Sequence, residues 1–228
     1  LSYILRMENI LRFLKQLDMN NNREWFAEHK VEYEAAKNEF EQICAALIFE
    51  IAKFDNDIKH LEVKDCVFRI YRDIRFTTDK TPYKTHFGAY IASGGGRKSQ
   101  RGGYYLHLDP NGSFFSVGVW GPQPNVLKAL RRSIYENIEE FNEIRNTTDF
   151  KTLFNDSFYE EDKLKTIPAG FPKDFQDAEI LKLKHYLISS TLDENILYSD
   201  QFVSEVAVIA EKAAPFLRFL NYTVDEVI

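Results

Sequence analysis

The stretch YYLHLDPNGSFFSVGVW, from Tyr104 to Trp120, has the pattern of a β-hairpin. Aromatic or aliphatic residues recur at every second position in residues 104–108 and again in residues 114–120, which is the period of a strand with one buried face. Asp109-Pro110-Asn111-Gly112 separates the two segments and consists of residues that favour tight turns. Strands joined by a short turn run antiparallel, so this stretch predicts an antiparallel sheet.

A further alternating segment precedes the hairpin. Residues 66–76 place most apolar side chains on one side of an extended chain and polar side chains on the other. We expect a strand there, then a turn, and a second strand from Thr85 to Ala92. Arg72 interrupts the apolar side, and a buried arginine is costly unless it is paired. Three outcomes fit: a β-bulge at Arg72, a contact with a carboxylate from a helix, or the end of strand pairing before Arg72.

Helices are predicted on both sides of the strands. Apolar residues recur at helical spacing in residues 8–17, 23–51, 124–145 and 200–220. Asn21 and Glu24 have the spacing of a capping box at the start of the second helix. A last strand is expected at residues 183–189. This order predicts one α+β domain, residues 1–228, with a largely antiparallel sheet flanked by N-terminal, central and C-terminal helices.

The composition limits the functional classes. The chain has 228 residues, 44% of them apolar, and a net charge of −6, so it can build a core and is not expected to coat duplex DNA. Cys44 and Cys66 are the only cysteines, which argues against a disulfide framework or a cysteine zinc site. No apolar run approaches the roughly 20 residues of a membrane span. We expect a cytoplasmic protein, with residues 1–6 as a non-native or poorly ordered leader before Met7.

Polar and aromatic side chains of the strands form the candidate site. If the strand registers align, one face of the sheet carries arginine, aspartate, histidine and tyrosine together. Arginine binds phosphate or carboxylate with a planar fork, and histidine and tyrosine are neutral donors near pH 7. We expect Asp73 and His86 to act as acid or base. The expected ligand-binding residues are Arg69, Arg72, Arg75, Lys80, Lys84, Tyr105, His107 and Trp120.

Common cofactor motifs are absent from the sequence. The glycines of residues 94–103 do not match GxxxxGK[ST], and neither HExxH nor GxSxG occurs. The five histidines are dispersed, without the spacing typical of a metal site. We therefore expect no cofactor and no metal. The basic loop Arg97-Lys98-Ser99-Gln100-Arg101 is flanked by glycines and is expected to be mobile.

The central stretch resembles a known family. FRIYRDIRF at residues 68–76 and DKTPYKTHFG at residues 79–88 are similar to the signature of the family called domain of unknown function 2461. The matching segments elsewhere are Asn22–Phe26, Gly103–His107, Gly118–Trp120 and residues 179–184. The similarity covers nearly the whole chain from about Met7. It implies a single domain and assigns no reaction, substrate or catalytic residue.

Three functions fit these residues. The first is an anion-binding domain that binds, or acts as an enzyme on, a small molecule with a phosphate or carboxylate group. The alternative is a nucleic-acid or protein interaction module that uses the basic loop and exposed aromatic rings. In the third, the charged face is a salt-bridge lattice or a protein interface. No membrane partner is expected.

Overall fold

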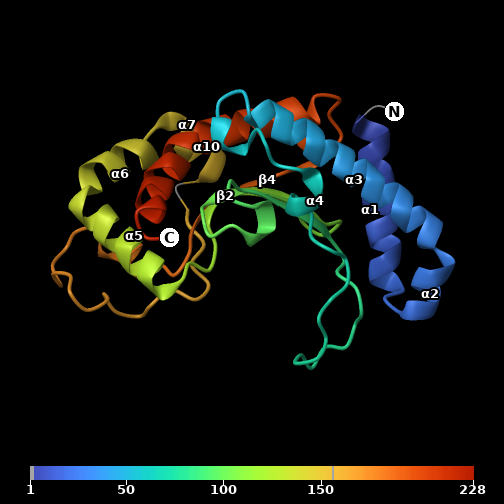
Figure 1. Cartoon of the computed structure of the whole chain (residues 1–228), viewed down its shortest axis with the longest axis horizontal. Helices are drawn as coiled ribbons and strands as arrows, with labels where there is room; N and C mark the ends of the chain where they lie inside the picture. Colours follow the sequence, from blue (N-terminus) through green and yellow to red (C-terminus); the bar gives the residue numbers. More distant parts are fainter. Residues whose placement is uncertain (1–2, 156) are drawn as a thin grey trace.

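The computed structural model describes residues 3–155 and 157–228, and their strands form one sheet (Figure 1). The strands are β1 (Phe87–Ile91), β2 (Gly103–Leu108), β3 (Phe114–Val119) and β4 (Tyr186–Thr191). They lie in the order β1-β2-β3-β4, and every neighbouring pair is antiparallel. Together with the helices around it, this sheet confirms the predicted α+β class and the predicted hairpin.

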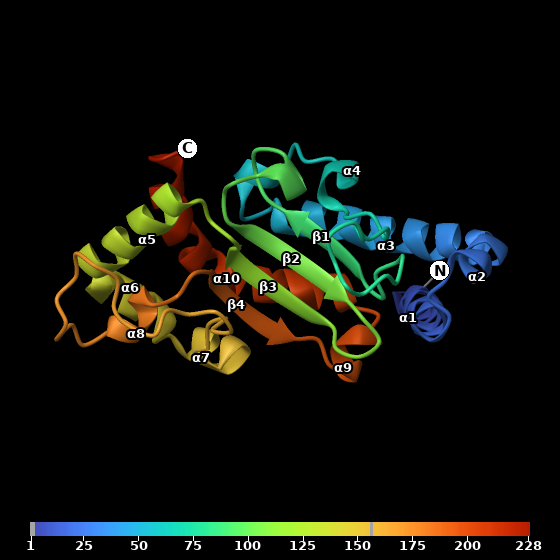
Figure 2. The same cartoon turned by 90° about the horizontal axis from the view of Figure 1, so that it is seen from below.

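One face of the sheet carries the core. Ala89, Leu106 and Phe115 lie side by side on this face in the register of β1, β2 and β3, and all three are fully buried. Two long helices, α3 (Lys30–Ile51) and α10 (Phe202–Asp225), pack on it and contact β1 and β3 respectively. Figure 2 shows both helices behind the sheet, with the opposite face toward the viewer. We call that opposite face the uncovered face.

The N-terminal helices differ in detail from the prediction. Helix α1 spans Tyr3–Met19 and packs on α3, and a short helix, α2 (Arg23–Glu28), lies between them. The chain leaves helical geometry at His29, so the predicted helix is two helices. The capping box expected at Asn21 was wrong, because Asn22 is the N-cap and accepts from the Trp25 N–H. Of the expected leader, residues 1 and 2 lie outside the described residues, and residues 3–6 belong to α1.

The predicted central and C-terminal elements are present with shifted bounds. The helix expected at residues 124–145 is broken at Asn137 into α5 (Pro124–Glu136) and α6 (Ile138–Arg145). The last strand begins at Tyr186 and ends at Thr191, later than expected. The remaining short elements are η1 (Asn56–Ile58), α4 (Val63–Cys66), η2 (Gly96–Lys98), α7 (Thr148–Phe154), α8 (Ala178–Leu181) and α9 (Glu194–Leu197). Among the described helices, none combines the length and apolar character needed to cross a membrane.

The strand expected at residues 66–76 was wrong. Its first residue ends α4, and the rest of the segment makes only two isolated bridges, Val67 with Ala89 and Tyr71 with Tyr83. Between the two bridges the first segment advances by four residues (71 − 67) and the second segment by six (89 − 83). The second segment therefore has two extra residues, which bulge out of the pairing. Residues 68–86, which we call the arm, project away from the sheet in Figure 1. The bulge spans residues 84–88, where the arm ends and β1 begins.

Candidate functional site

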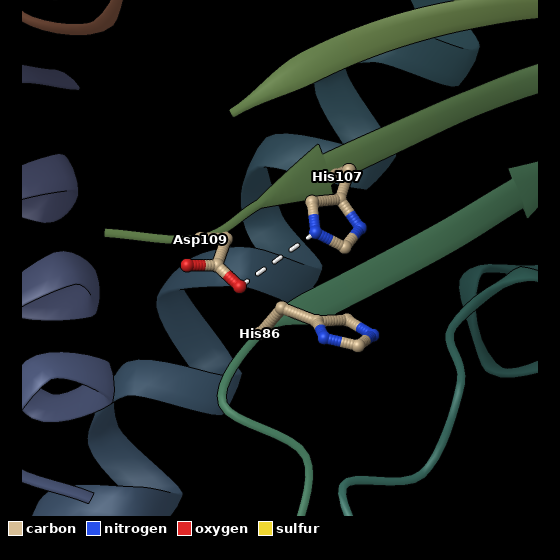
Figure 3. A group of neighbouring side chains, drawn as sticks. All are labelled: His86, His107 and Asp109. Carbon is tan, nitrogen blue, oxygen red and sulfur yellow. Dashed lines mark ion pairs between the residues drawn. The ribbon is translucent and has the colours of Figure 1, made fainter. Parts of the chain in front are cut away.

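Two histidines and an aspartate meet at one end of the uncovered face (Figure 3). His86 directly precedes β1, His107 lies in β2, and Asp109 begins the turn after β2. The two imidazole rings are 4.3 Å apart between centroids, and Nε2 of His107 lies 3.9 Å from Oδ2 of Asp109. Asp109 was not among the predicted site residues, although it has the same strand parity as His107. We call His86, His107 and Asp109 the His-His-Asp cluster.

The register of β1 and β2 orients the ring of His107. Gly88 lies opposite His107, and Tyr90 lies opposite Tyr105, so the expected parity within these two strands is found. The Tyr105 hydroxyl group is 3.0 Å from Nδ1 of His107. Phe114, the partner of His107 in β3, stacks on the imidazole at a centroid distance of 4.5 Å. These contacts leave Nε2 as the ring nitrogen that points toward Asp109.

Burial keeps both histidines neutral near pH 7. Burial is the main cause of the lowered pKa of His107, which falls to about 4, and the proximity of His86 and Lys84 lowers it further. The pKa of His86 is lowered by burial first and then by Lys84, while Asp109 acts in the opposite direction. A neutral imidazole has a free lone pair on one ring nitrogen, so each ring can accept a proton or bind a cation.

Lys84 and Arg69 add positive charge beside this cluster. The Lys84 ammonium lies 5.2 Å from the centroid of the Phe68 ring, which in turn meets the edge of Tyr105. Burial lowers the pKa of Lys84, and the nearby Arg69 guanidinium lowers it further. Within the part of the chain that the structure describes, neither Lys84 nor Arg69 has a carboxylate within ion-pair distance. Lys84 is therefore available to an external anion, and Arg69, whose charge also acts on Asp73, lies near it.

The other charged residues predicted for the site are paired within the arm. Arg72 bonds to Asp79 at 2.5 Å and to the Thr81 hydroxyl group, and its side chain keeps 27% of its exposure. The carboxylate that pairs with Arg72 therefore comes from a loop, whereas one of the predicted outcomes was a carboxylate from a helix. Arg75 forms a two-point pair with Asp73, at 2.9 and 2.7 Å.

Lys80 and Tyr71 also point elsewhere. Lys80 donates to the carbonyl oxygen of Ile74. Tyr71 packs against Tyr83 and against Phe26 of α2. Because residues 66–76 are not a strand of the sheet, their exposed side chains do not extend the sheet face that carries Tyr105 and His107.

Trp120 lies in a separate cluster at the other end of β3. It stacks on His185 with centroids 4.1 Å apart and meets the edge of Tyr159 at 5.0 Å. His185 accepts a hydrogen bond at Nδ1 from the N–H of Gly121. Six residues separate Trp120 from Phe114, a span of about 20 Å along a strand. Trp120 and His107 therefore do not share one small ligand, and His185 is a neighbour that no sequence signal indicated.

The glycine-rich loop is anchored to the rest of the chain. Arg101 is only 16% exposed and forms ion pairs with Asp57 at 2.9 Å and Asp225 at 2.8 Å. Arg97 donates to the carbonyl oxygens of Lys64 and Val67. The expected mobile basic loop therefore has two of its three cations engaged in contacts within the protein.

Two grooves lie away from the His-His-Asp cluster. One, of about 810 Å³, runs between α5, α6 and α10, and its lining includes Arg132, Glu140 and Arg218. The other, of about 620 Å³, lies between the start of α2 and the arm, and its lining includes Arg23 and Lys80. Neither groove is lined by His86 or His107.

Comparison with known proteins identifies a family and gives no further relative. No curated protein and no solved structure matches the chain. Residues 9–219 match the model of a family described as conserved hypothetical protein (DUF2461), which is the family that the motifs of the arm resemble. The match covers most of the 228 residues, and the chain belongs to this family.

Proposed function

We propose that the uncovered face of the sheet binds a small molecule with a phosphate or carboxylate group beside His86 and His107. The observation that carries the proposal is Lys84, a cation without an ion-pair partner among the described residues, next to two neutral imidazoles and close enough to Arg69 for that guanidinium to lower its pKa. Unpaired cations close together repel each other, and an anion between them removes that repulsion. Phe68 and Tyr105 add aromatic surface beside the same position.

The two histidines would give the site its chemistry. A neutral imidazole near a bound anion can accept a proton from a substrate hydroxyl group or from water, and the resulting imidazolium can return it. The hydroxyl group of Tyr105, at 3.0 Å, holds the ring of His107 in place during such a transfer. Asp73 has no part in this proposal, because Arg75 engages its carboxylate on the exposed arm.

The nucleic-acid alternative has weaker support. It requires free cations on the glycine-rich loop, and Arg97 and Arg101 already contact backbone carbonyls and aspartates of this chain. Lys98 is the exposed cation that is left there. One lysine on a chain of net charge −6 is a poor basis for binding a phosphate backbone.

A thermal-shift screen tests the anion proposal. The wild-type chain is heated with a panel of phosphate- and carboxylate-bearing metabolites and with uncharged analogues. A ligand at one hundred times its Kd adds about 2.7 kcal/mol of stability, or a rise of roughly 5–10 °C in Tm for a chain of this size. We expect Lys84→Gln and Arg69→Gln to lose this rise and the control Lys98→Gln to keep it.

Two outcomes would count against the proposal. One is a panel in which no anionic compound raises Tm. The other is a rise that Lys84→Gln and Arg69→Gln retain, since the anion would then bind elsewhere. Added salt should reduce a genuine shift, because it screens the partly exposed cations.

A further inference from the structure

The His-His-Asp cluster has the composition of a metal centre. His86, His107 and Asp109 each offer one ligand atom, and the three atoms lie within 4.8 Å of one another. Imidazole nitrogens with one carboxylate oxygen form a common ligand set for divalent first-row transition ions, including zinc and non-haem iron. We infer that these three residues bind one such ion, which would be a site beyond the anion binding proposed above.

The orientation of His107 supports this inference independently of the cluster's composition. A histidine that binds a metal through one ring nitrogen usually has the other held by a hydrogen bond, which fixes the ring and its tautomer. Here Nδ1 of His107 lies 3.0 Å from the Tyr105 hydroxyl group, and Nε2 faces Asp109. Gly88 makes room for that hydroxyl group, because a Cβ atom at position 88 would lie 2.6 Å from it. The second coordination layer of a metal-binding histidine is therefore already built.

Each of the other two ligands has an atom that is free to bind. His86 forms no hydrogen bond with any other residue in the described part of the chain. The Asn111 N–H donates to Oδ1 of Asp109 at 2.8 Å, whereas Oδ2 lies 3.9 Å from Nε2 of His107, which is too long for a hydrogen bond, so Oδ2 is the free carboxylate oxygen. Ligands about 2.1 Å from a tetrahedral ion lie roughly 3.4 Å apart. Since the ligand atoms lie within 4.8 Å of one another, the cluster needs to close by about 1.4 Å at most to bind such an ion.

Three protein ligands leave coordination positions open. Structural zinc sites are usually closed by four protein ligands, whereas catalytic sites have three and keep a position for water or substrate. The three residues are partly buried, so that position would be only partly open to solvent. Lys84 is close enough to influence both histidines and opposes a cation there. Lys84→Gln is therefore expected to tighten metal binding, the opposite of its expected effect on an anion.

A metal titration of the untagged, chelator-treated protein tests the inference. Zn²⁺ is titrated by calorimetry, and Co²⁺ is titrated while its visible absorption is recorded, in a buffer with chloride as the only anion. We expect one ion per chain, visible Co²⁺ bands, and competition by Zn²⁺ but not by Mg²⁺, which prefers oxygen ligands. His107→Ala and His86→Ala should each lower the Zn²⁺ affinity at least 100-fold. The matched control His185→Ala, at the far end of the sheet, should retain it.

Two further variants separate a metal role from a role in folding. Tyr105→Phe keeps the ring and removes the hydroxyl group, and it should lower the Zn²⁺ affinity by about 10- to 100-fold with the fold intact. Asp109→Asn should also weaken binding, and it remains informative if His107→Ala fails to fold. No saturable binding of Zn²⁺ or Co²⁺, or binding that survives both His86→Ala and Asp109→Asn, would overturn the inference. Because no anionic ligand is present, the result does not depend on the proposed anion.

Discussion

The side chain of Asn21 holds the backbone of Tyr83, 62 residues later, through two hydrogen bonds. Its Nδ2 donates to the Tyr83 carbonyl oxygen at 2.9 Å, and the Tyr83 N–H donates to Oδ1 at 3.1 Å. The side-chain amide of Asn21 thus bonds to the backbone of the arm in the way that a neighbouring strand would. The ring of Tyr83 stacks on Phe26 of α2, so the N-terminal helices fix the base of the segment that carries Lys84 and His86.

Asn21→Ala is expected to destabilise the protein by about 1–3 kcal/mol, because two partly buried backbone groups lose their partners. Urea unfolding measures the change. Asn20→Ala is the control, since the Asn20 amide donates only to the exposed end of α1 and its loss should have less than half that effect. Equal effects of the two substitutions would show that the contact between Asn21 and Tyr83 has no special role.

Arg72 closes the outer part of the arm onto itself through Asp79 and Thr81. Arg72→Ala is expected to speed tryptic cleavage at Lys80 several-fold without unfolding the rest of the chain, because loops are cleaved when their local contacts open. Asp79→Ala should have the same effect. Asp73→Ala should not, since it breaks only the exposed pair with Arg75. Limited proteolysis followed by mass spectrometry distinguishes these outcomes.

The hairpin was predictable because its pattern is set by the core. Leu106 and Phe115 are paired in the register of β2 and β3 and are fully buried, so alternate positions had to be apolar. Residues 68–76 have a similar alternation for a different reason. Ile70 is buried, but Arg75 and Asp73 pair with each other in solvent, and no strand among the described residues pairs with them. Alternation alone does not distinguish these two situations.

The site was predictable only in part because it depends on pairing between strands. Strand parity correctly placed Tyr105 and His107 on one face, but only the register brings Gly88 opposite His107. The contact of His86 with His107 also depends on the bulge before β1, and no local pattern of residues predicts that bulge. Asp109 was expected in the turn and was not predicted as a site residue, although its position two residues after His107 gives it the same strand parity.

Burial should make both thiols unreactive in the folded protein. It raises the pKa of the Cys66 thiol to about 11, and it also raises the pKa of Cys44. An unfolded thiol has a pKa of about 8.5, so at that pH fewer than about one Cys66 in a hundred is a thiolate in the folded state. A thiol reagent at pH 8.5 should label two cysteines per chain in denaturant and almost none without it. Rapid labelling of the folded chain would contradict the burial of these residues.

The same shift has a consequence for stability. Because the pKa of Cys66 is higher in the folded state than in the unfolded state, its contribution is fully present below about pH 8.5 and is lost as the pH rises toward about 11. Cys66→Ala should flatten the decline in unfolding free energy across this window. Urea unfolding at a series of pH values measures the slope, and an unchanged slope would show that other groups cause the decline.

Gly118 is the glycine at which adding a side chain is expected to destabilise the fold most. Its φ is +136°, and a Cβ atom there would lie 1.9 Å from the carbonyl oxygen of Tyr186 in the neighbouring strand. Gly118→Ala therefore adds backbone strain and a clash with an atom that cannot rotate away, and we expect a loss of roughly 3 kcal/mol or more. Gly112→Ala, in the turn after β2, meets no atom within 4 Å and should change the stability by about 0.5 kcal/mol at most. Urea unfolding of both variants tests the contrast, and equal stability would mean that β3 and β4 are not paired in this register.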